Sequence, residues 1–126
     1  MRQHFALSFE AAAAILGMRL VALNDDGQAI TAASSAARII GASDAVGAAA
    51  GEMLDAHMLG ELPVTAGGVI KPGDPVTADA QGRAVVASPV AGTVIRIAGF
   101  ATTKATAAGD IVQVFLLPSV GSSAAA

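Results

Sequence analysis

The chain has 126 residues, a length typical of a single domain. Apolar residues make up 54% of it, but much of this is alanine and only 3% is aromatic, so any core must be built from Val, Ile, Leu and four Phe. A core of such modest volume favours stabilisation by association with other subunits. The net charge of -3 argues against binding a nucleic-acid backbone, which requires a basic surface, and the lack of cysteine excludes disulfides and thiolate metal ligands.

Residues 1–17 are predicted to form an N-terminal arm or an edge strand. Phe5, Leu7 and Phe9 alternate with smaller or polar residues, a period of two that is typical of an extended strand. Nothing in the second half of the sequence matches this segment, so it is placed outside the repeat described next. Ala11–Leu16 is predicted to form a helical turn on propensity. The charges that flank it do not fit an export signal, and no apolar stretch is long enough to span a bilayer, so we expect a soluble protein made in the cytoplasm.

Residues 18–118 contain one β-rich unit in two copies, at about 18–65 and 66–118. Arg38-Ile39-Ile40-Gly41 returns as Arg96-Ile97-Ala98-Gly99, and Gly51-Glu52 returns as Gly109-Asp110, at a constant shift (38 to 96, 51 to 109). Closer to the N-terminus of each copy, a second set of residues matches at a slightly shorter shift, for example Val21 with Val76. Units of this size cannot easily bury their apolar faces alone, so the copies are expected to pack against each other.

Each copy is predicted to contain a β-hairpin with an acidic turn. The first hairpin, 18–31, turns at Asn24-Asp25-Asp26-Gly27, and the second, 75–87, turns at Asp79-Ala80-Gln81-Gly82. A glycine in the turn tolerates the positive φ that tight hairpins need. The polar side chains are interpreted as bonding the backbone of their own turn rather than a metal ion.

Further strands follow the hairpins in both copies. The predicted strands are 38–42 and 53–59, continued by 61–65, in the first copy, and 91–100 and 111–117 in the second. The last is the most continuously apolar and is expected to be buried on both faces. Pro118 is expected to end it, and 119–126 is expected to be a disordered tail. Many short strands with Gly and Pro turns predict an all-β fold, a small antiparallel barrel or sandwich built from two duplicated strand units with an extended N-terminal arm.

The sequence offers few groups for catalysis. His4 and His57 are far apart, which argues against a histidine metal cluster, and His57 is interpreted as a surface or half-buried strand residue. Glu52 and Asp110 each follow a glycine at matched positions, which indicates a repeated structural role such as bonding a turn amide. We therefore expect no enzyme activity, cofactor or metal site.

A carrier function is the main alternative. The segment Ser88-Pro89-Val90-Ala91-Gly92-Thr93-Val94 resembles the entry strand of biotinyl and lipoyl carrier domains, whose fold is also a duplicated β-sandwich. Those domains present a modifiable lysine at a hairpin tip. Here Lys104 and Lys71 lack the flanking residues of such a tip, so a carrier or small-ligand binding module is kept only as the alternative.

Several fragments taken together resemble the capsid cement, or head decoration, proteins of tailed bacteriophages and prophages. The resemblance covers about Met18 to Pro118 and is carried by Arg38–Gly41, Ala49–Glu52, Val69–Asp79, Gly82–Val85 and Ala107–Val112. It implies a structural virion protein on the outer capsid surface, bound to the major capsid protein and clamping adjacent subunits so that the shell is stabilised. It also implies a homo-oligomer, with a trimer favoured, and neither nucleic acid nor membrane as a partner.

Two sets of residues are candidates for contacts with other subunits. The N-terminal arm is the candidate capsid contact, with Phe5, Leu7 and Phe9 as apolar anchors beside Arg2 and His4, adding a strand to a capsid sheet edge. The alternative is that the same apolar residues close the barrel of this chain. Phe100, which stands where the first copy has Ala42, is a candidate subunit contact.

Overall fold

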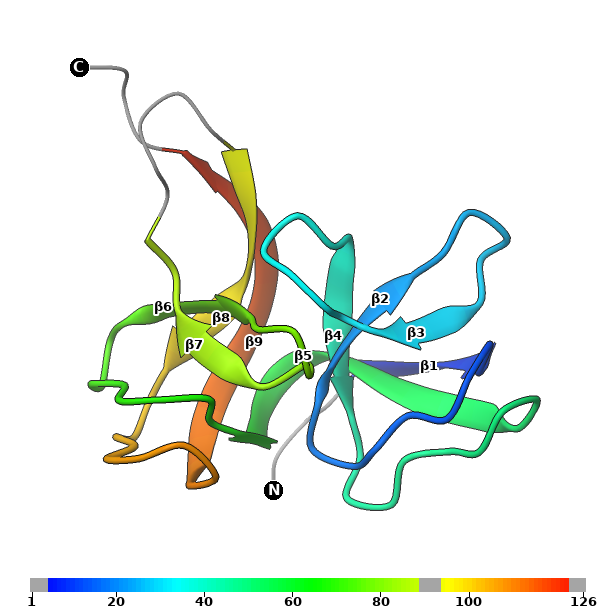
Figure 1. Cartoon of the computed structure of the whole chain (residues 1–126), viewed down its shortest axis with the longest axis horizontal. Helices are drawn as coiled ribbons and strands as arrows, with labels where there is room; N and C mark the ends of the chain where they lie inside the picture. The colour runs from blue at the N-terminus through cyan, green and yellow to red at the C-terminus, as the bar shows by residue number, and fades with distance from the viewer. Residues whose placement is uncertain (1–4, 89–93, 123–126) are drawn as a thin grey trace.

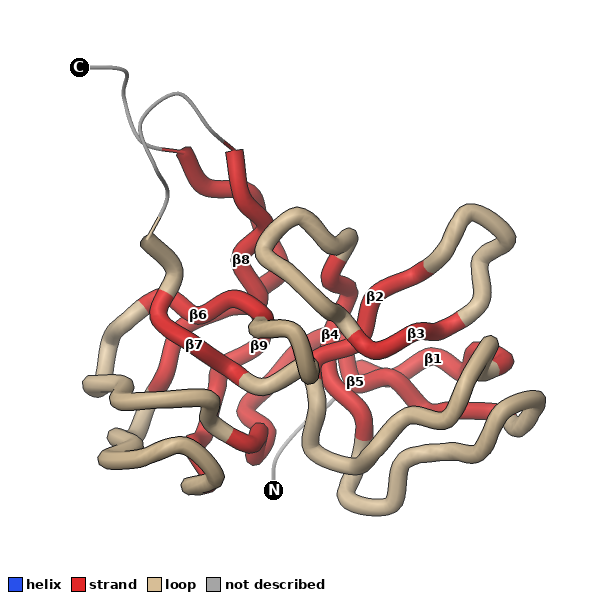
Figure 2. Tube along the Cα trace, in the orientation of Figure 1, coloured by secondary structure: helices blue, strands red, loops and turns tan. Residues whose placement is uncertain are grey.

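The structure, a computed structural model, describes residues 5–88 and 94–122. Within these ranges it consists of strands and turns and has no helix, which confirms the all-β class (Figures 1 and 2). The strands are β1 Phe5–Glu10, β2 Leu20–Leu23, β3 Ala29–Thr31, β4 Ile39–Ser43, β5 Met53–Thr65, β6 Pro75–Ala78, β7 Ala84–Val86, β8 Val94–Ala101 and β9 Ile111–Ser122.

The strands form two lobes that share β5 (Figure 1). They are hydrogen-bonded in the order β3-β2-β4-β5-β9-β8-β6-β7, and β1 pairs with β5 off this path. The first lobe contains β1 to β4 and the first half of β5, whereas the second lobe contains the second half of β5 and β6 to β9. Because one long strand belongs to both lobes, the backbone connects them without a linker.

The two lobes use the same strand register. In the hairpins, Val21 pairs with Thr31 and Val76 pairs with Val86, each 55 residues further on (21 to 76, 31 to 86). In the next ladder, Ala42 pairs with His57 in the first lobe. Its counterpart is the pair of Phe100 and Phe115, each 58 residues further on (42 to 100, 57 to 115). The predicted duplication of a strand unit is therefore confirmed in the pairing of the backbone.

The register also gives β1 a counterpart, which the sequence did not show. Phe9 pairs with Leu54 in the first lobe, and Val64 pairs with Val112 in the second, at the same two shifts (9 to 64, 54 to 112). The counterpart of β1 is thus the second half of β5. The two segments share one residue at a matched position, Leu7 with Leu62, so the hydrogen-bond pattern is what relates them. We infer that the repeat begins at β1 and runs through residues 5–59 and then 60–122.

Each lobe closes on itself through a single parallel bridge. Ala11 bridges to Ala29 in the first lobe, and Ala66 bridges to Ala84 in the second. The helical turn that propensity alone allows at Ala11–Leu16 does not form, because tertiary pairing decides this segment: it contains bends, and its buried residue Ile15 bridges to Ala48. Long-range backbone pairing here outweighs the local helix propensity of alanine.

The core is continuous between the lobes. One cluster fills the first lobe and consists of Ala11, Ile15, Val21, Ala29, Leu54 and Ala56. A larger cluster fills the second lobe and extends into the contact between lobes, where it includes Leu20, Ala22, Ala32, Ile39 and Ala42 of the first lobe. The strand β4 also contacts both β8 and β9. The expectation that the two copies pack against each other therefore describes the observed core.

The strand β9 departs from its prediction in two ways. Only one of its faces is buried, since Val112, Val114 and Leu116 point inward, whereas Ile111, Phe115 and Leu117 are exposed. The strand also continues through Pro118 to Ser122. A shift in the register with β8 moves the pairing from Leu116 to Ser119, so Pro118 lies in the irregularity and its missing N–H interrupts no ladder bond.

Candidate functional surfaces

The hairpin turns are fixed by a polar side chain at equivalent positions. The Asn24 Oδ1 atom accepts hydrogen bonds from the amides two and four residues further on, at 3.0 and 2.9 Å. The Asp79 Oδ1 atom accepts the same two bonds at 2.8 and 2.9 Å. The interpretation that these side chains bond the backbone of their own turn is therefore confirmed.

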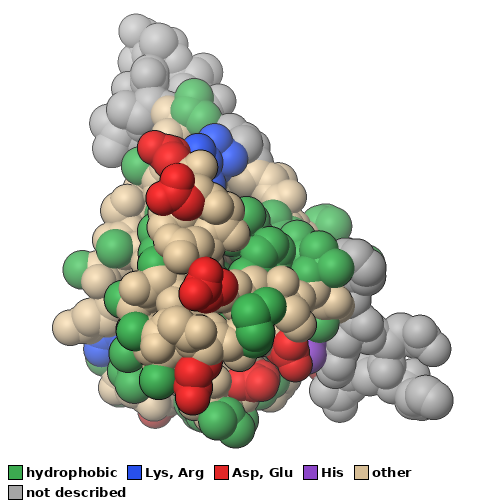
Figure 3. Space-filling view, turned by 90° about the vertical axis from the view of Figure 1, so that its right-hand side faces the viewer, with side chains coloured by type: hydrophobic (Ala, Val, Ile, Leu, Met, Phe, Trp, Pro, Cys, Tyr) green, Lys and Arg blue, Asp and Glu red, His purple; other side chains and the backbone are tan. Residues whose placement is uncertain are grey.

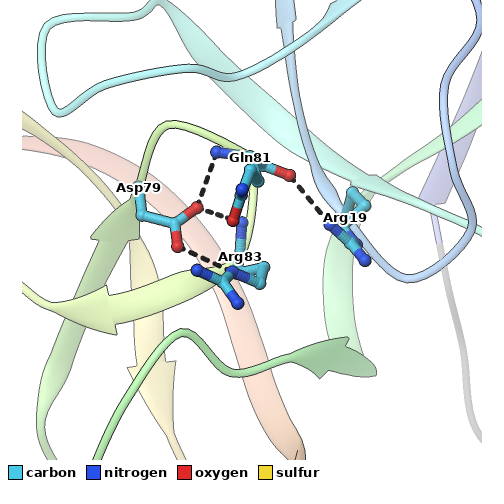
Figure 4. Close-up of polar contacts among 4 residues, drawn as sticks. All are labelled: Arg19, Asp79, Gln81 and Arg83. Atoms are coloured by element: carbon cyan, nitrogen blue, oxygen red, sulfur yellow. Dashed lines mark hydrogen bonds and ion pairs between the residues drawn. The ribbon is translucent and has the colours of Figure 1, made fainter. Parts of the chain in front are cut away.

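The second of these turns, Asp79–Gly82, also joins the lobes (Figure 4). The Arg19 guanidinium of the first lobe donates to the Gln81 carbonyl at 3.0 Å, and the Leu20 amide donates to the Gly82 carbonyl at 2.7 Å. Within the turn, Arg83 Nε donates to Asp79 Oδ2 at 2.8 Å. Partial burial raises the pKa of Asp79, but the bonds from the Arg83 and Gln81 amides and from the Arg83 guanidinium outweigh it, so the pKa lies below its ordinary value.

The turn fits closely against the first lobe. Gly82 has a φ of +76°, and a Cβ placed on it would lie 2.5 Å from the Thr31 methyl group. The same Cβ would lie 3.2 Å from the Leu20 carbonyl oxygen and 3.4 Å from that of Ala32. We call these three residues, Leu20, Thr31 and Ala32, the turn seat. Glycine is required at this position both by the backbone conformation and by the contact.

The matched acidic residues before β5 and β9 have the predicted structural role. The Asp110 carboxylate accepts bonds from the Thr106 amide at 2.9 Å and the Ala107 amide at 3.2 Å. Glu52 accepts one from the Ala49 amide at 3.0 Å. The Thr106 amide bond is the main reason that the pKa of Asp110 is lowered. These carboxylates hold loops in place.

The hollow at the junction of the lobes is wide and shallow. It measures about 500 Å³ and is lined by Leu16, Arg19, Thr31, Gln81 and Arg83, together with Ala14. Among residues 5–88 and 94–122, no group of three or more His, Cys, Asp or Glu side chains could hold a metal ion. The same residues contain no helix that is long and apolar enough to cross a membrane.

The predicted capsid-contact residues fall into three groups. Arg2 and His4 lie outside the described residues, and of Phe5 only the backbone is described, paired with Leu59. Leu7 is 45% exposed, whereas Phe9 packs against the core of the first lobe. The segment thus forms a strand that pairs with β5 in the sheet of this chain.

The residues that suggested a carrier are not gathered into a site. In the segment that resembles a carrier entry strand, residues 89–93 lie outside the described ranges. Lys104 is exposed in the connection between β8 and β9, and Lys71 is exposed in the turn before β6. His57 is half-buried on β5, opposite Ala42, as predicted.

Phe100 lies on an open apolar surface of the second lobe. Its ring stacks on that of Phe115, with centroids 5.6 Å apart and an interplanar angle of 19°. Both rings remain partly exposed, at 40% and 37%. Beside them is a groove of about 230 Å³, which we call the Phe100 groove, lined by Pro75, Ile97, Gly99, Phe100, Leu117 and Ser119. Phe115 and Leu117 were not predicted as surface residues, because a continuously apolar strand is expected to be buried on both faces.

The opposite end of the molecule, formed by the first lobe, is mixed in character. Acidic side chains are scattered among apolar ones over the face seen in Figure 3, and basic side chains are visible near its top and at its left edge. One ion pair, between Arg38 and Asp25, lies on the surface of this lobe. A hydrogen bond from Arg38, together with its charge, lowers the pKa of Asp25. This face lacks the continuous basic surface that phosphate binding requires.

The chain is all-β, has two lobes and exposes apolar surface, and the carboxylates of Glu52, Asp79 and Asp110 accept hydrogen bonds from their own loops. These are features of a structural protein. Comparison with known proteins identifies the family. The family model described as phage cement protein matches residues 1–116. The chain therefore belongs to the phage cement protein family, and its role is that of a capsid-associated structural protein.

The solved structures include one of similar fold. It is that of the N base of the head fiber gp8.5 in bacteriophage phi29, with a TM-score of 0.66 and 23% sequence identity, over 91% of this chain and 95% of that one. At this identity the likeness shows the fold. No curated protein matches the chain.

Proposed function

We propose that this protein binds the outer surface of a phage capsid and stabilises the shell by clamping adjacent copies of the major capsid protein. The observation that carries this proposal is the match of the family model to residues 1–116. A ligand that binds only the assembled shell shifts the equilibrium toward the assembled state by mass action. Many weak contacts repeated over the lattice add to this through multivalency.

The architecture suits a clamp. The two lobes share β5 and a continuous core, so a force applied to one lobe is carried to the other by backbone hydrogen bonds and packed side chains. A protein that bridges two shell subunits needs this stiffness, because a flexible linker would let the subunits separate. We also propose that the protein acts as a homo-oligomer, with a trimer favoured, in the virion.

The N-terminal segment is our proposed capsid contact. Its residues are Arg2, His4, Phe5, Leu7 and Phe9, of which Leu7 offers an exposed apolar side chain on β1. Since β1 is already paired with β5 on one side, we place the capsid contact on the exposed part of this strand and on the residues that precede it.

Co-sedimentation with capsids tests the function. The protein is mixed with expanded and with unexpanded shells of its phage, and the shells are then heated with and without it. We expect binding to at least one form and a higher temperature of shell disruption when the protein is bound. Failure to bind either form would refute the proposal.

A pair of matched variants tests the contact. Leu7→Asp places a charge on β1, whereas Val69→Asp places the same charge on the second lobe at a side chain that is 65% exposed. We expect Leu7→Asp and a deletion of residues 1–4 to weaken capsid binding, with Val69→Asp unchanged. Circular dichroism checks that each variant is folded. Equal binding by all the folded variants would exclude the N-terminal segment as the contact.

The carrier alternative has its own check. Expression together with a biotin ligase and a lipoyl ligase, followed by measurement of the intact mass, would reveal an adduct on Lys104 or Lys71. We expect no adduct.

A further inference from the structure

The contact between the lobes consists of a turn of the second lobe and a seat on the first lobe. Each lobe also carries the equivalent of the part that the other supplies. In the first lobe, the turn seat receives the Asp79–Gly82 turn of the second lobe. The equivalent seat on the second lobe, 55 residues further on, consists of Pro75, Val86 and Ala87. The equivalent turn on the first lobe is Asn24–Gly27, with Gly27 at the position of Gly82.

The two seats differ in exposure at one position, Pro75, while Val86 is half-buried like Thr31 and Ala87 is buried like Ala32. Leu20 and Ala42 in the first lobe are both 0% exposed, because the second lobe packs over them. Their equivalents, Pro75 and Phe100, are exposed, Phe100 to 40%. Both residues line the Phe100 groove. At Pro75 and Phe100 the groove therefore presents positions of the repeat that, in the first lobe, are buried by another lobe, whereas Leu117 is exposed like its first-lobe equivalent Leu59, at 47%.

The first turn is free where the second is seated. Gly27 has a φ of +77°, close to the +76° of Gly82, so the two turns have the same backbone conformation. A Cβ on Gly27 would meet nothing within 4 Å, in contrast to the close approach of Gly82 to Thr31. Figure 1 shows the β2–β3 turn projecting away from the rest of the chain, while the β6–β7 turn lies between the lobes.

We propose that the Phe100 groove and the adjoining second seat bind the Asn24–Gly27 turn and first lobe of a second copy of this chain. The occupant is argued from the chain itself, since the equivalent face of the first lobe is already covered by a lobe of the same repeat. Such a head-to-tail contact is heterologous, and it generates a closed ring when the rotation per copy closes. In a closed ring, the second seat of every copy binds the Asn24–Gly27 turn of its neighbour.

The contact between copies differs from the contact within the chain in its chemistry. Pro75 stands in place of Leu20 and has no N–H to donate, and Asp74 stands in place of Arg19. The Asp74 carboxylate accepts a bond from the Lys71 amide at 3.0 Å, so it is held by its own turn. In place of the missing bonds, Phe100 adds apolar surface where the first lobe has Ala42. The association is thus apolar and depends on protein concentration.

This inference rests on the proposed homo-oligomer and not on capsid binding, so it is tested on the free protein. The molecular mass in solution is measured by light scattering after size exclusion, for the wild type and for Leu117→Asp. Leu117 is 53% exposed, and Ser119→Arg supplies a second substitution on the same groove. Val46→Asp, on the first lobe at a side chain that is 86% exposed, is the matched control.

We expect the wild type and Val46→Asp to have the mass of several chains, and the two groove variants to be folded with the mass of one chain. A wild type that remains a single chain at the highest concentration measured would overturn the proposal. Folded groove variants that keep the wild-type mass would also overturn the proposal. If such variants lost only capsid binding, the groove would be assigned to the contact with the shell.

Cross-linking then distinguishes a head-to-tail contact from a symmetric one. The chain contains no cysteine, so single cysteines can be placed without background. Asp26→Cys lies on the free turn and Val86→Cys on the free seat, at the positions equivalent to Gln81 and Thr31. We expect a disulfide-linked dimer when the two variants are mixed and little when either is oxidised alone. Cross-linking of each variant with itself, or none in the mixture, would contradict the head-to-tail arrangement.

Discussion

The seating of one turn against the other lobe predicts that two equivalent glycines differ in their tolerance of alanine. Gly27 and Gly82 have φ values of +77° and +76°, so alanine meets the same backbone strain at both, about 1–2 kcal/mol. At Gly27 the added methyl group meets nothing within 4 Å. At Gly82 it would lie 2.5 Å from the Thr31 methyl group, so the turn or the Thr31 side chain must shift.

The displacement adds an overpacking cost of about 1–3 kcal/mol, which is typical when a methyl group is forced into a filled contact. We therefore expect Gly27→Ala to lower the free energy of unfolding by about 1–2 kcal/mol and Gly82→Ala by about 2–5 kcal/mol. Urea unfolding of the two variants and the wild type, followed by circular dichroism, measures both values. An equal loss in the two variants would show that the turn does not carry the contact between the lobes.

Three further predictions concern the second lobe. Because the bonds that Asp79 accepts lower its pKa in the folded state, its contribution to stability is present above about pH 4 and is lost as the pH falls through the folded pKa. Asp79→Asn keeps an acceptor for the turn amides but loses the ion pair with Arg83, so we expect acid unfolding monitored by circular dichroism to show a shallower pH dependence; an unchanged profile would contradict this. Leu116→Ala should lower the free energy of unfolding in urea by about 2–5 kcal/mol because Leu116 is fully buried in the core cluster, and a loss below 1 kcal/mol would argue against that burial. Gly99→Ala would place a Cβ 2.0 Å from the Phe115 carbonyl oxygen, so we expect a loss of at least about 1–3 kcal/mol in the same assay, and near-wild-type stability would mean that β8 and β9 are further apart at this point.

The comparison of lobes also shows how a duplicated unit acquires two different surfaces. The first lobe carries Ala42 and His57 at the positions where the second carries Phe100 and Phe115. Alanine is small enough for the second lobe to pack over it, and a phenylalanine at the same place would prevent that approach. The outer face of the second lobe is free of this restriction and bears two stacked rings. Divergence of a few side chains thus separates an internal contact from an external one.

The sequence by itself determined the local chemistry of this protein. The two hairpins follow from turns in which Asn24 or Asp79 bonds the backbone and a glycine takes positive φ, interactions that span at most four residues. The loops before β5 and β9 follow in the same way from Glu52 and Asp110. The repeat was visible because these short-range requirements preserve glycines and hydrogen-bonding side chains at matched positions.

Only the tertiary structure decided which surfaces the repeat buries. The counterpart of β1 was hidden because strand pairing depends on backbone register and alternation, which different residues satisfy equally well. The exposure of one face of β9 could not be predicted from the sequence for a related reason. A continuously apolar strand has the same sequence pattern whether or not a second layer covers its outer face. Gly27 and Gly82 occupy equivalent positions in the repeat and have nearly the same φ, yet a Cβ on Gly27 would meet nothing whereas one on Gly82 would meet Thr31. That difference is made by residues of the other lobe, more than 50 positions away (82 against 31).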